Sequence, residues 1–385
     1  MVNDKPNADK GSLAKLSDAA LIGLLQKQIP ADLGLANRSV PLPPVPYRQK
    51  PTETLKDASE TPAATAHESE PDSDLSLLLG QLDPPQQPDE LARIEGYRIL
   101  NVLGIGGMGI VFQAEDLKLH RQVAIKLIRP GRFKDRRAAK RFLTEAQAAA
   151  RLNHDHIVTV YHVGQHGDIP YLVMQLLSGQ SLASRLRLES KLDVVTALNI
   201  ARQVALGLAA AHGDGMLHRD IKPDNIWLDA TSSRVKILDF GLAQLAVPDF
   251  DEPERDSFAG TPNYIAPERI RGEPGDHRSD LFSIGVVVYE MLAGQKPFQA
   301  SRITSTLHKA AQFEFPPLPN LDPRFDPVVR RLVDELLEKD PSQRIADAAG
   351  LVKKLTVSYR WAWPKERQML LSTRSVRRFL VQLGF

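Results

Sequence analysis

The sequence contains no cysteine. Disulfide bonds and thiolate metal sites are therefore excluded, which fits a reducing cytoplasm. The formal net charge is only +2 over 385 residues, so charge gives no argument for nucleic acid or an anionic membrane as a partner. No apolar run approaches the roughly 20 residues of a transmembrane helix, and the first residues carry no apolar signal-peptide core. These absences predict a soluble, cytoplasmic chain without a transmembrane segment.

The first part of the chain, residues 1–94, has few aromatic residues and many prolines. Between Pro51 and Glu90 there are ten acidic residues and a single basic residue, Lys56. Such a segment has too little apolar surface to offset the entropy lost on ordering. We therefore expect residues 1–94 to form a disordered, acidic, proline-rich arm.

Two leucine-rich stretches interrupt this arm. Each is interpreted either as a docking helix or as a transient helix without a partner. The first contains Leu13, Leu16, Leu21, Leu24 and Leu25, and the second contains Leu75, Leu77, Leu78 and Leu79.

The most informative stretch runs from His218 to Asn225, with the sequence HRDIKPDN. It places an aspartate, a lysine and an asparagine at fixed offsets. Phosphoryl transfer needs such a set: a carboxylate to orient a hydroxyl, an ammonium to balance phosphate charge, and an amide oxygen for a metal ion. A polar loop matching by chance is the alternative, but three further motifs of the same kind occur in order.

The first of these motifs is a glycine-rich run, in which glycines let backbone N–H groups approach a triphosphate. Its glycine spacing also matches the dinucleotide-binding pattern, which requires a helix to start at the glycines. Here the apolar runs of residues 110–114 and 122–128 follow the glycines and flank a polar turn instead, and this pattern predicts a β-hairpin. The run consists of Leu103, Gly104, Ile105, Gly106, Gly107, Met108, Gly109, Ile110 and Val111.

The other two motifs are Val123-Ala124-Ile125-Lys126 and Asp239-Phe240-Gly241. Lys126 lies late in an apolar strand, where a lysine often simply reaches out to water. A stretch of strong helix formers around Glu145 follows, so that glutamate is a candidate ion-pair partner for Lys126. Asp239 follows an apolar run, and a carboxylate in that place is a good Mg²⁺ ligand.

Together these motifs resemble the protein kinases, and most closely the bacterial Hanks-type serine/threonine kinases. The resemblance implies an α+β, bilobal fold with a small β-rich lobe and a larger helical lobe. It covers residues 97–359, with the hinge at Gln175–Leu177, and leaves residues 360–385 as a basic, aromatic tail. It also implies that Glu268 pairs with Arg344, and that residues 280–285 belong to the central helix of the large lobe.

The resemblance implies a role for each site residue, with ATP and Mg²⁺ bound and protein Ser/Thr hydroxyls as substrates. Catalysis falls to Asp220, Lys222, Lys126 and Glu145. Mg²⁺ is assigned to Asn225 and Asp239. Nucleotide binding is assigned to the glycine-rich run together with Ala124, Lys126, Gln175, Leu177 and Trp227. Trp227 replaces the leucine or methionine that is usual at the floor of the adenine pocket.

Regulation and rival functions complete the expectations. Ser257 is predicted to be the activating autophosphorylation site, for which the chain is expected to self-associate. The alternatives are a nucleotide-binding pseudokinase scaffold, and an adaptor that works through the N-terminal arm.

Three smaller features have competing interpretations. Four histidines suggest a metal site: His154, His156, His162 and His166. The better explanation is that residues 152–158 resemble the turn that follows the kinase regulatory helix, here the helix around Glu145. His218 is expected to be a packed core residue beneath Phe240. The tail is either a membrane-surface or partner segment or a terminal helix on the large lobe.

Overall fold

The structure is a computed structural model. It describes residues 71–129, 136–232, 234–240, 262–312, 314–318, 321 and 326–362. Side chains are described throughout these ranges except at 71–73, 136–138 and 357–362.

The small lobe is built on a six-stranded antiparallel sheet with the order β1-β2-β3-β4-β6-β5. β3 and β4 form the hairpin predicted after the glycine-rich run, with Val111 paired to Lys126. The glycine-rich turn itself joins β2 to β3, with Ile105 paired to Ile110 at its end. The strands are β1 (Ala92–Ile94), β2 (Tyr97–Ile105), β3 (Gly109–Asp116), β4 (Arg121–Ile128), β5 (Val160–His166) and β6 (Ile169–Gln175).

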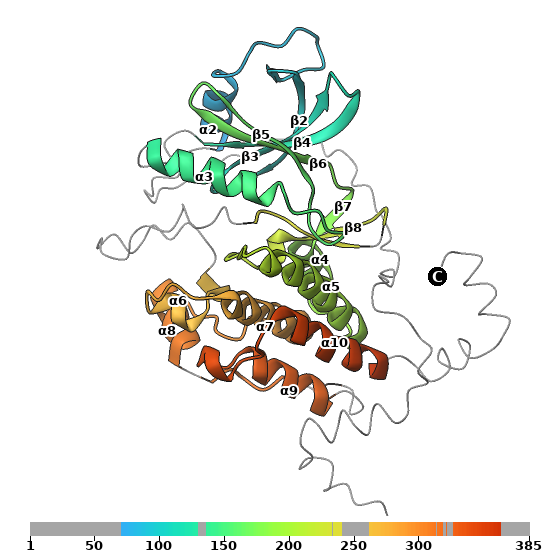
Figure 1. The fold of residues 1–385 in the computed structure, drawn as a ribbon, viewed down its shortest axis with the longest axis vertical. Helices are drawn as coiled ribbons and strands as arrows, with labels where there is room; N and C mark the ends of the chain where they lie inside the picture. Colours follow the sequence, from blue (N-terminus) through green and yellow to red (C-terminus); the bar gives the residue numbers. More distant parts are fainter. Residues whose placement is uncertain are drawn as a thin grey trace, which may run out of the picture. The chain divides into compact units, whose positions relative to one another are not determined.

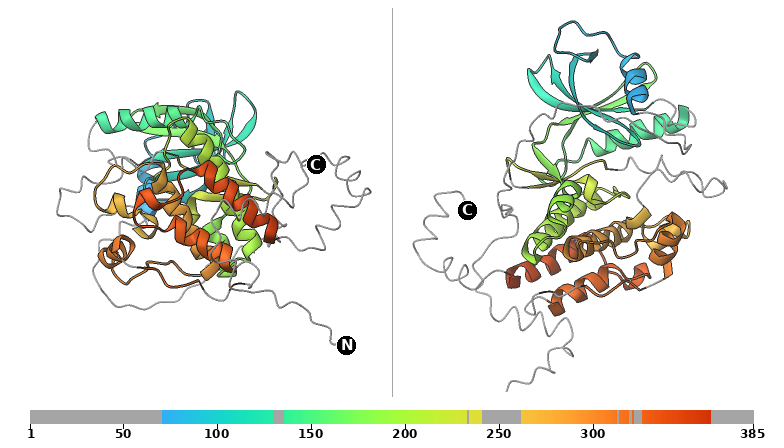
Figure 2. Two further views of the ribbon diagram at one scale, coloured as in Figure 1. Left: turned by 60° about the horizontal axis from the view of Figure 1, so that its bottom comes forward. Right: turned by 180° about the vertical axis from the view of Figure 1, so that it is seen from behind.

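Each face of this sheet is covered by one helix. Side chains alternate along a strand, so Val123, Ile125 and Leu127 of β4 join one buried cluster while Ala124 and Ile128 join another. Helix α3 (Arg136–Ala149) packs on the Ala124 face through Phe142 and Ala146. Helix α2 (Pro71–Leu79) packs on the Val123 face (Figures 1 and 2).

The expectation of disorder as far as residue 94 is wrong for residues 71–94. Leucines at positions i, i+3 and i+4 of α2 form one apolar stripe, and Leu78 is only 1 % exposed against the sheet. β1 then pairs with β2 and buries Ala92 and Ile94. The second leucine cluster is thus a helix docked on the small lobe, because the sheet supplies an apolar partner.

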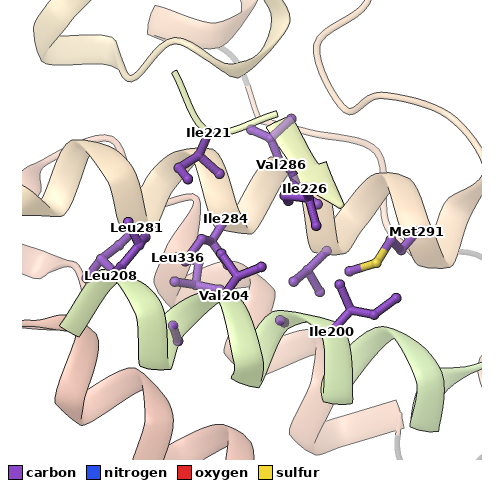
Figure 3. Close-up of a cluster of buried hydrophobic side chains, with 14 of the residues drawn as sticks. Ile200, Val204, Leu208, Ile221, Ile226, Leu281, Ile284, Val286, Met291 and Leu336 are labelled. Atoms are coloured by element: carbon purple, nitrogen blue, oxygen red, sulfur yellow. The ribbon is translucent and has the colours of Figure 1, made fainter. Parts of the chain in front are cut away.

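The large lobe is mainly helical, and α5 and α7 form its centre. Ile200, Val204 and Leu208 of α5 meet Leu281, Ile284 and Met291 of α7 in the interior (Figure 3). α10 packs along α5. The helices are α4 (Leu182–Glu189), α5 (Val194–Gly213), α6 (Pro267–Ile270), α7 (His277–Ala293), α8 (Ile303–Gln312), α9 (Asp326–Leu336) and α10 (Ala348–Ala362).

The large lobe also contains a small antiparallel sheet with the order β7-β8-β9, which buries Ile226, Leu228 and Ile237 in the core. Its strands are β7 (Gly179–Ser181), β8 (Ile226–Asp229) and β9 (Val235–Ile237), and the short 3₁₀ turns are η2 (Pro223–Asn225), η4 (Pro262–Tyr264) and η5 (Pro341–Gln343). Among the helices described, α5 alone is long and apolar enough to cross a bilayer, and 72 % of its apolar window is buried inside the large lobe.

Candidate active site

The loop with the sequence HRDIKPDN, residues 218–225, lies between α5 and β8 and is called the catalytic loop below. It is anchored in the large-lobe core at two points. Ile221 and Ile226 lie on either side of η2 and are each 1 % exposed. Figure 3 shows both side chains in the cluster formed with α5 and α7. The polar residues between and before these anchors are therefore held at the surface of a packed core.

Asp280 of α7 fixes the backbone at the start of this loop. Its carboxylate accepts hydrogen bonds from the backbone N–H of His218 (2.9 Å) and of Arg219 (2.7 Å), and contacts His212 Nε2 at 2.9 Å. Burial opposes ionisation of Asp280, but these partners outweigh it and lower its pKa. They also hold Arg219 at φ +65°, a left-handed conformation unfavourable for a residue with a Cβ.

Sequence reasoning placed Asp280 on the central helix but missed this role. The available signal was an aspartate beginning an otherwise apolar stretch of helix. A fully buried carboxylate needs partners, and the loop backbone provides them.

His218 is a structural residue, as predicted. Its side chain is fully buried, its Nε2 lies 2.7 Å from the carbonyl oxygen of Leu238, and its ring meets the edge of Phe240 at 4.7 Å. These contacts join the catalytic loop to the segment that carries Asp239.

Asp220, Lys222 and Asn225 come together as predicted. The Asp220 Oδ2 accepts from Lys222 Nζ at 2.7 Å and from Asn225 Nδ2 at 2.9 Å. Asn225 Nδ2 also donates to the Asp220 carbonyl oxygen at 2.8 Å. The carboxylate is thus oriented by two side chains, and its side chain remains 29 % exposed for a substrate hydroxyl.

Asp239 lies after β9 with φ +57°, a left-handed conformation. Its Oδ2 accepts from Lys126 Nζ at 2.7 Å. Burial would raise the pKa of Asp239, but the Lys126 ammonium lowers it on balance. The predicted lysine and metal-binding aspartate therefore meet directly, across the two lobes.

Glu145 does not pair with Lys126 in this structure, contrary to the prediction. The ammonium is engaged by Asp239, and the Glu145 Oε2 is buried without a hydrogen bond. Burial raises the pKa of Glu145, while Arg219 and Arg141 act in the opposite direction. The reason is competition: one ammonium has two candidate carboxylates, and the one on the large lobe holds it.

The glycines of the turn between β2 and β3 differ in how much room a side chain would have there. A Cβ at Gly109 would collide with the Leu127 carbonyl oxygen, so this position requires glycine for strand packing. A Cβ at Gly104 would meet nothing within 4 Å, and one at Gly106 only the Gly109 oxygen at 3.7 Å. The space above these two glycines is left open, as a bound triphosphate requires.

Apolar side chains from both lobes form the wall expected for a nucleobase. Val111, Ala124, Met174, Leu177 and Leu238 belong to one cluster, in which Ala124 and Met174 are buried. The walls predicted from the sequence are thus brought together.

Two predicted nucleotide residues behave differently from this group. Ile110 is fully buried on the opposite face of the sheet because β3 alternates, so only its backbone faces the site. The Gln175 N–H donates to the carbonyl oxygen of Thr159, the residue before β5, at 2.9 Å, so this N–H is already engaged.

Trp227 lies on β8 between Ile226 and Leu228, both buried in the large-lobe core. Alternation therefore turns Trp227 to the other face of the strand. Its Nε1 donates to the Ser178 carbonyl oxygen at 2.8 Å, just after the hinge. This bond fixes the indole at the end of the site where the hinge lies.

The donor set fits Mg²⁺ and a nucleoside triphosphate. The hydrogen bonds of Asn225 use Nδ2, and those of Asp239 use Oδ2, so each leaves one oxygen for a cation. In the described ranges no three His, Cys, Asp or Glu residues form a metal cluster. Mg²⁺ suits such a sparse set, because it usually takes its remaining ligands from phosphates and water.

The large lobe is closed by the ion pair predicted between Glu268 and Arg344. The two side chains are 2 % and 0 % exposed, and Arg344 donates from both terminal nitrogens at 2.8 Å. Ser279 donates to the same carboxylate at 2.7 Å. The prediction is confirmed. The ion pair fixes α6, which contains Glu268, to the turn η5, which Arg344 follows.

Some predicted residues lie outside the described ranges. They are Gly241 and Ser257, the arm before residue 71, and the tail from residue 363.

Comparison with known proteins agrees with this geometry. The family model of the protein kinase domain matches residues 97–355. The chain belongs to the protein kinase family. This kinase domain is also similar to bacterial serine/threonine kinases, and the chain is 37 % identical over 268 residues to serine/threonine-protein kinase pkn3 of Myxococcus xanthus. It is 35 % identical to PrkC of Bacillus subtilis and 37 % identical to PknA of Mycobacterium tuberculosis, each over 268 residues.

These alignments cover 67 %, 69 % and 67 % of this kinase chain, respectively. They cover 49 %, 41 % and 61 % of the relatives. The chain therefore spans about half the length of the relatives it matches.

Proposed function

We propose that this chain is an ATP-dependent serine/threonine protein kinase. The observation that carries the proposal is the arrangement of Asp220, Lys222 and Asn225, with Asp239 held opposite by Lys126. The names of its relatives support the Ser/Thr class.

Asp220 orients the substrate hydroxyl and accepts its proton. The hydroxyl oxygen forms a bond to the γ-phosphorus while the bond from that phosphorus to the bridging oxygen breaks, and ADP leaves. Lys222, already beside Asp220, balances the charge on the transferring group. Most of the rate comes from positioning and charge stabilisation, because little covalent chemistry is asked of the protein.

Asn225 and Asp239 would hold Mg²⁺, which supplies positive charge to the phosphate oxygens. Lys126 would contact the α- and β-phosphates, and Glu145 would be the carboxylate that orients its ammonium while Asp239 serves as a cation ligand. Val111, Ala124 and Leu177 pack around the adenine. The arrangement with Lys126 on Asp239 is then the resting state of the site.

All four residues whose loss would mark a pseudokinase are present: Lys126, Asp220, Asn225 and Asp239. This favours an enzyme over a nucleotide-sensing scaffold. A cytoplasmic location and self-association for autophosphorylation complete the proposal.

The deciding experiment is incubation of the full chain with Mg²⁺ and labelled ATP, followed by mapping of phosphorylated sites on the chain and on a generic basic protein. We expect phosphoserine and phosphothreonine. Label on neither protein, with the chain folded, would contradict the proposal.

The activating site is proposed to be Ser257. A phosphate adds about −1.5 to −2 charges at neutral pH and orders loops by recruiting basic residues. Ser257→Ala should lower activity about ten-fold, a barrier change of ~1.4 kcal/mol, and remove the main activation-segment phosphopeptide. Wild-type activity in this variant would place the switch elsewhere.

A further inference from the structure

Helix α2 lies outside the segment that matches the family, which begins at residue 97. Nevertheless it is part of the nucleotide-binding lobe. Leu78 is buried in the same cluster as Phe112 and Ile125, and Leu75 and Leu79 pack against that cluster. α2 therefore supports the face of the sheet opposite to the one that holds Lys126 and α3.

A second attachment runs from α2 to the glycine-rich turn. Asp74 Oδ2 forms an ion pair with Arg129 Nη1, and the two side chains are 31 % and 21 % exposed. Arg129 directly follows β4, and its backbone N–H donates to the Met108 carbonyl oxygen at 3.1 Å. Met108 lies in the glycine-rich turn, so two consecutive bonds connect α2 to the element that covers the phosphates.

A third attachment holds the other side of the same turn. The chain leaving α2 reaches Glu90, whose fully buried carboxylate accepts from Arg93 at 2.6 Å and from Arg98 at 2.7 Å. Arg98 belongs to β2, the strand that leads into the turn, and Leu91 N–H donates to the Ile99 carbonyl oxygen of that strand at 2.8 Å. Residues 71–94 thus hold the turn through β2 on one side and through Arg129 on the other.

We propose that α2 positions the glycine-rich turn for nucleotide binding, with Asp74 and Leu78 as its positioning residues. A turn with four glycines loses much conformational entropy when it orders around a triphosphate. Restraints that exist before binding reduce that loss. Detaching α2 therefore weakens ATP binding while leaving the transfer step nearly unchanged. The inference rests on the proposed kinase function for its nucleotide.

The test compares variants of the full chain, and α2 itself provides a matched control. Asp74→Asn removes the charge from a partly exposed side chain, and Asp74→Glu retains it. Leu78→Ala removes the buried anchor, whereas Leu77→Ala changes a leucine of the same helix that is 60 % exposed. Calorimetry with a non-hydrolysable ATP analogue and Mg²⁺ measures Kd, kinase assays measure kcat, and amide hydrogen exchange follows the Arg129 N–H.

We expect Asp74→Asn to raise Kd about three- to five-fold, the range of a partly exposed ion pair, with kcat within about two-fold. Arg129 exchange should accelerate in the same variant. Leu78→Ala should raise Kd further, and Asp74→Glu and Leu77→Ala should bind like the wild type. Asp74→Asn removes no buried apolar group, so this variant should fold. It therefore tests the proposal even if Leu78→Ala does not fold.

Wild-type Kd and unchanged Arg129 exchange in both Asp74→Asn and Leu78→Ala would overturn the proposal. A loss of kcat at constant Kd would also overturn it. If the wild type binds no nucleotide, the proposed function fails instead. The exchange rate of Arg129 in Asp74→Asn then upholds or overturns the link between α2 and the turn by itself.

Discussion

The proposed mechanism takes one charged residue from the catalytic loop and one from helix α3, and these two residues are held in different ways. Asp220 is hydrogen-bonded by both of its side-chain partners, Lys222 and Asn225. The neighbouring backbone N–H of Arg219 donates to Asp280, and the side chain of Ile221 is buried in the core. On α3, Glu145 has no hydrogen bond for its buried Oε2. The large lobe therefore presents an assembled half of the site, and the small lobe an unassembled half, in which Glu145 and Lys126 are not paired.

The difference follows from where each residue takes its support. Asp220 takes its partners from the next five residues and from a buried helix. Glu145 depends on an ammonium that a third residue, Asp239, also attracts. Local and buried support favours one arrangement, whereas a shared ammonium can take either carboxylate as its partner.

The largest effect should come from breaking the assembled half. Asp220→Asn is nearly isosteric but removes the proton acceptor, so kcat should fall about 10²- to 10⁴-fold while nucleotide Kd changes little. Single-turnover kinetics and calorimetry measure the two quantities. Turnover above about a tenth of the wild type, a barrier change under ~1.4 kcal/mol, would contradict the role of Asp220.

An intermediate effect should come from the unassembled half. Lys126→Met should reduce activity about 10²- to 10³-fold, as loss of one charge-stabilising donor does, and Glu145→Ala should reduce it less. If Glu145 acts only through Lys126 in the active state, the double variant should be no worse than Lys126→Met alone. Simple addition of the two losses would show that Glu145 has another partner.

The smallest effect is on thermal stability. Replacing Glu145 by glutamine should raise Tm although it lowers activity. Burial raises the pKa of Glu145, so the unfolded chain releases this proton at a lower pH than the folded chain. The carboxylate therefore costs stability that grows as pH rises above its usual value of 4.5. Glu145→Gln should raise Tm by roughly a degree at pH 8 and by less at pH 5, while activity falls.

Thermal scans of wild type and Glu145→Gln at the two pH values check this prediction. Gln147, also on α3 but exposed, offers a control in the form of Gln147→Ala, whose Tm difference should not depend on pH. A lower Tm for Glu145→Gln at pH 8 would mean that the carboxylate is stabilised where it lies.

The catalytic loop was predictable because its function lies in residues adjacent in the chain. The offsets between Asp220, Lys222 and Asn225 almost dictate their contacts, and the hairpin of β3 and β4 followed from the apolar runs after the glycines. The partner of Lys126 was not predictable, because it depends on the relative free energies of two long-range ion pairs. The docking of α2 stayed open for a related reason: its leucines indicate a helix, but only the sheet shows what the helix packs against.

The bond from Trp227 to Ser178 has a practical optical consequence. The chain has three tryptophans, and the other two, Trp361 and Trp363, lie near its C-terminal end. Replacing those two by phenylalanine would leave a single indole, with known hydrogen bonding, beside the hinge. Its emission would then report on nucleotide occupancy directly, without a dye, a label or a coupled assay, and would allow the resting and nucleotide-bound populations to be followed in real time.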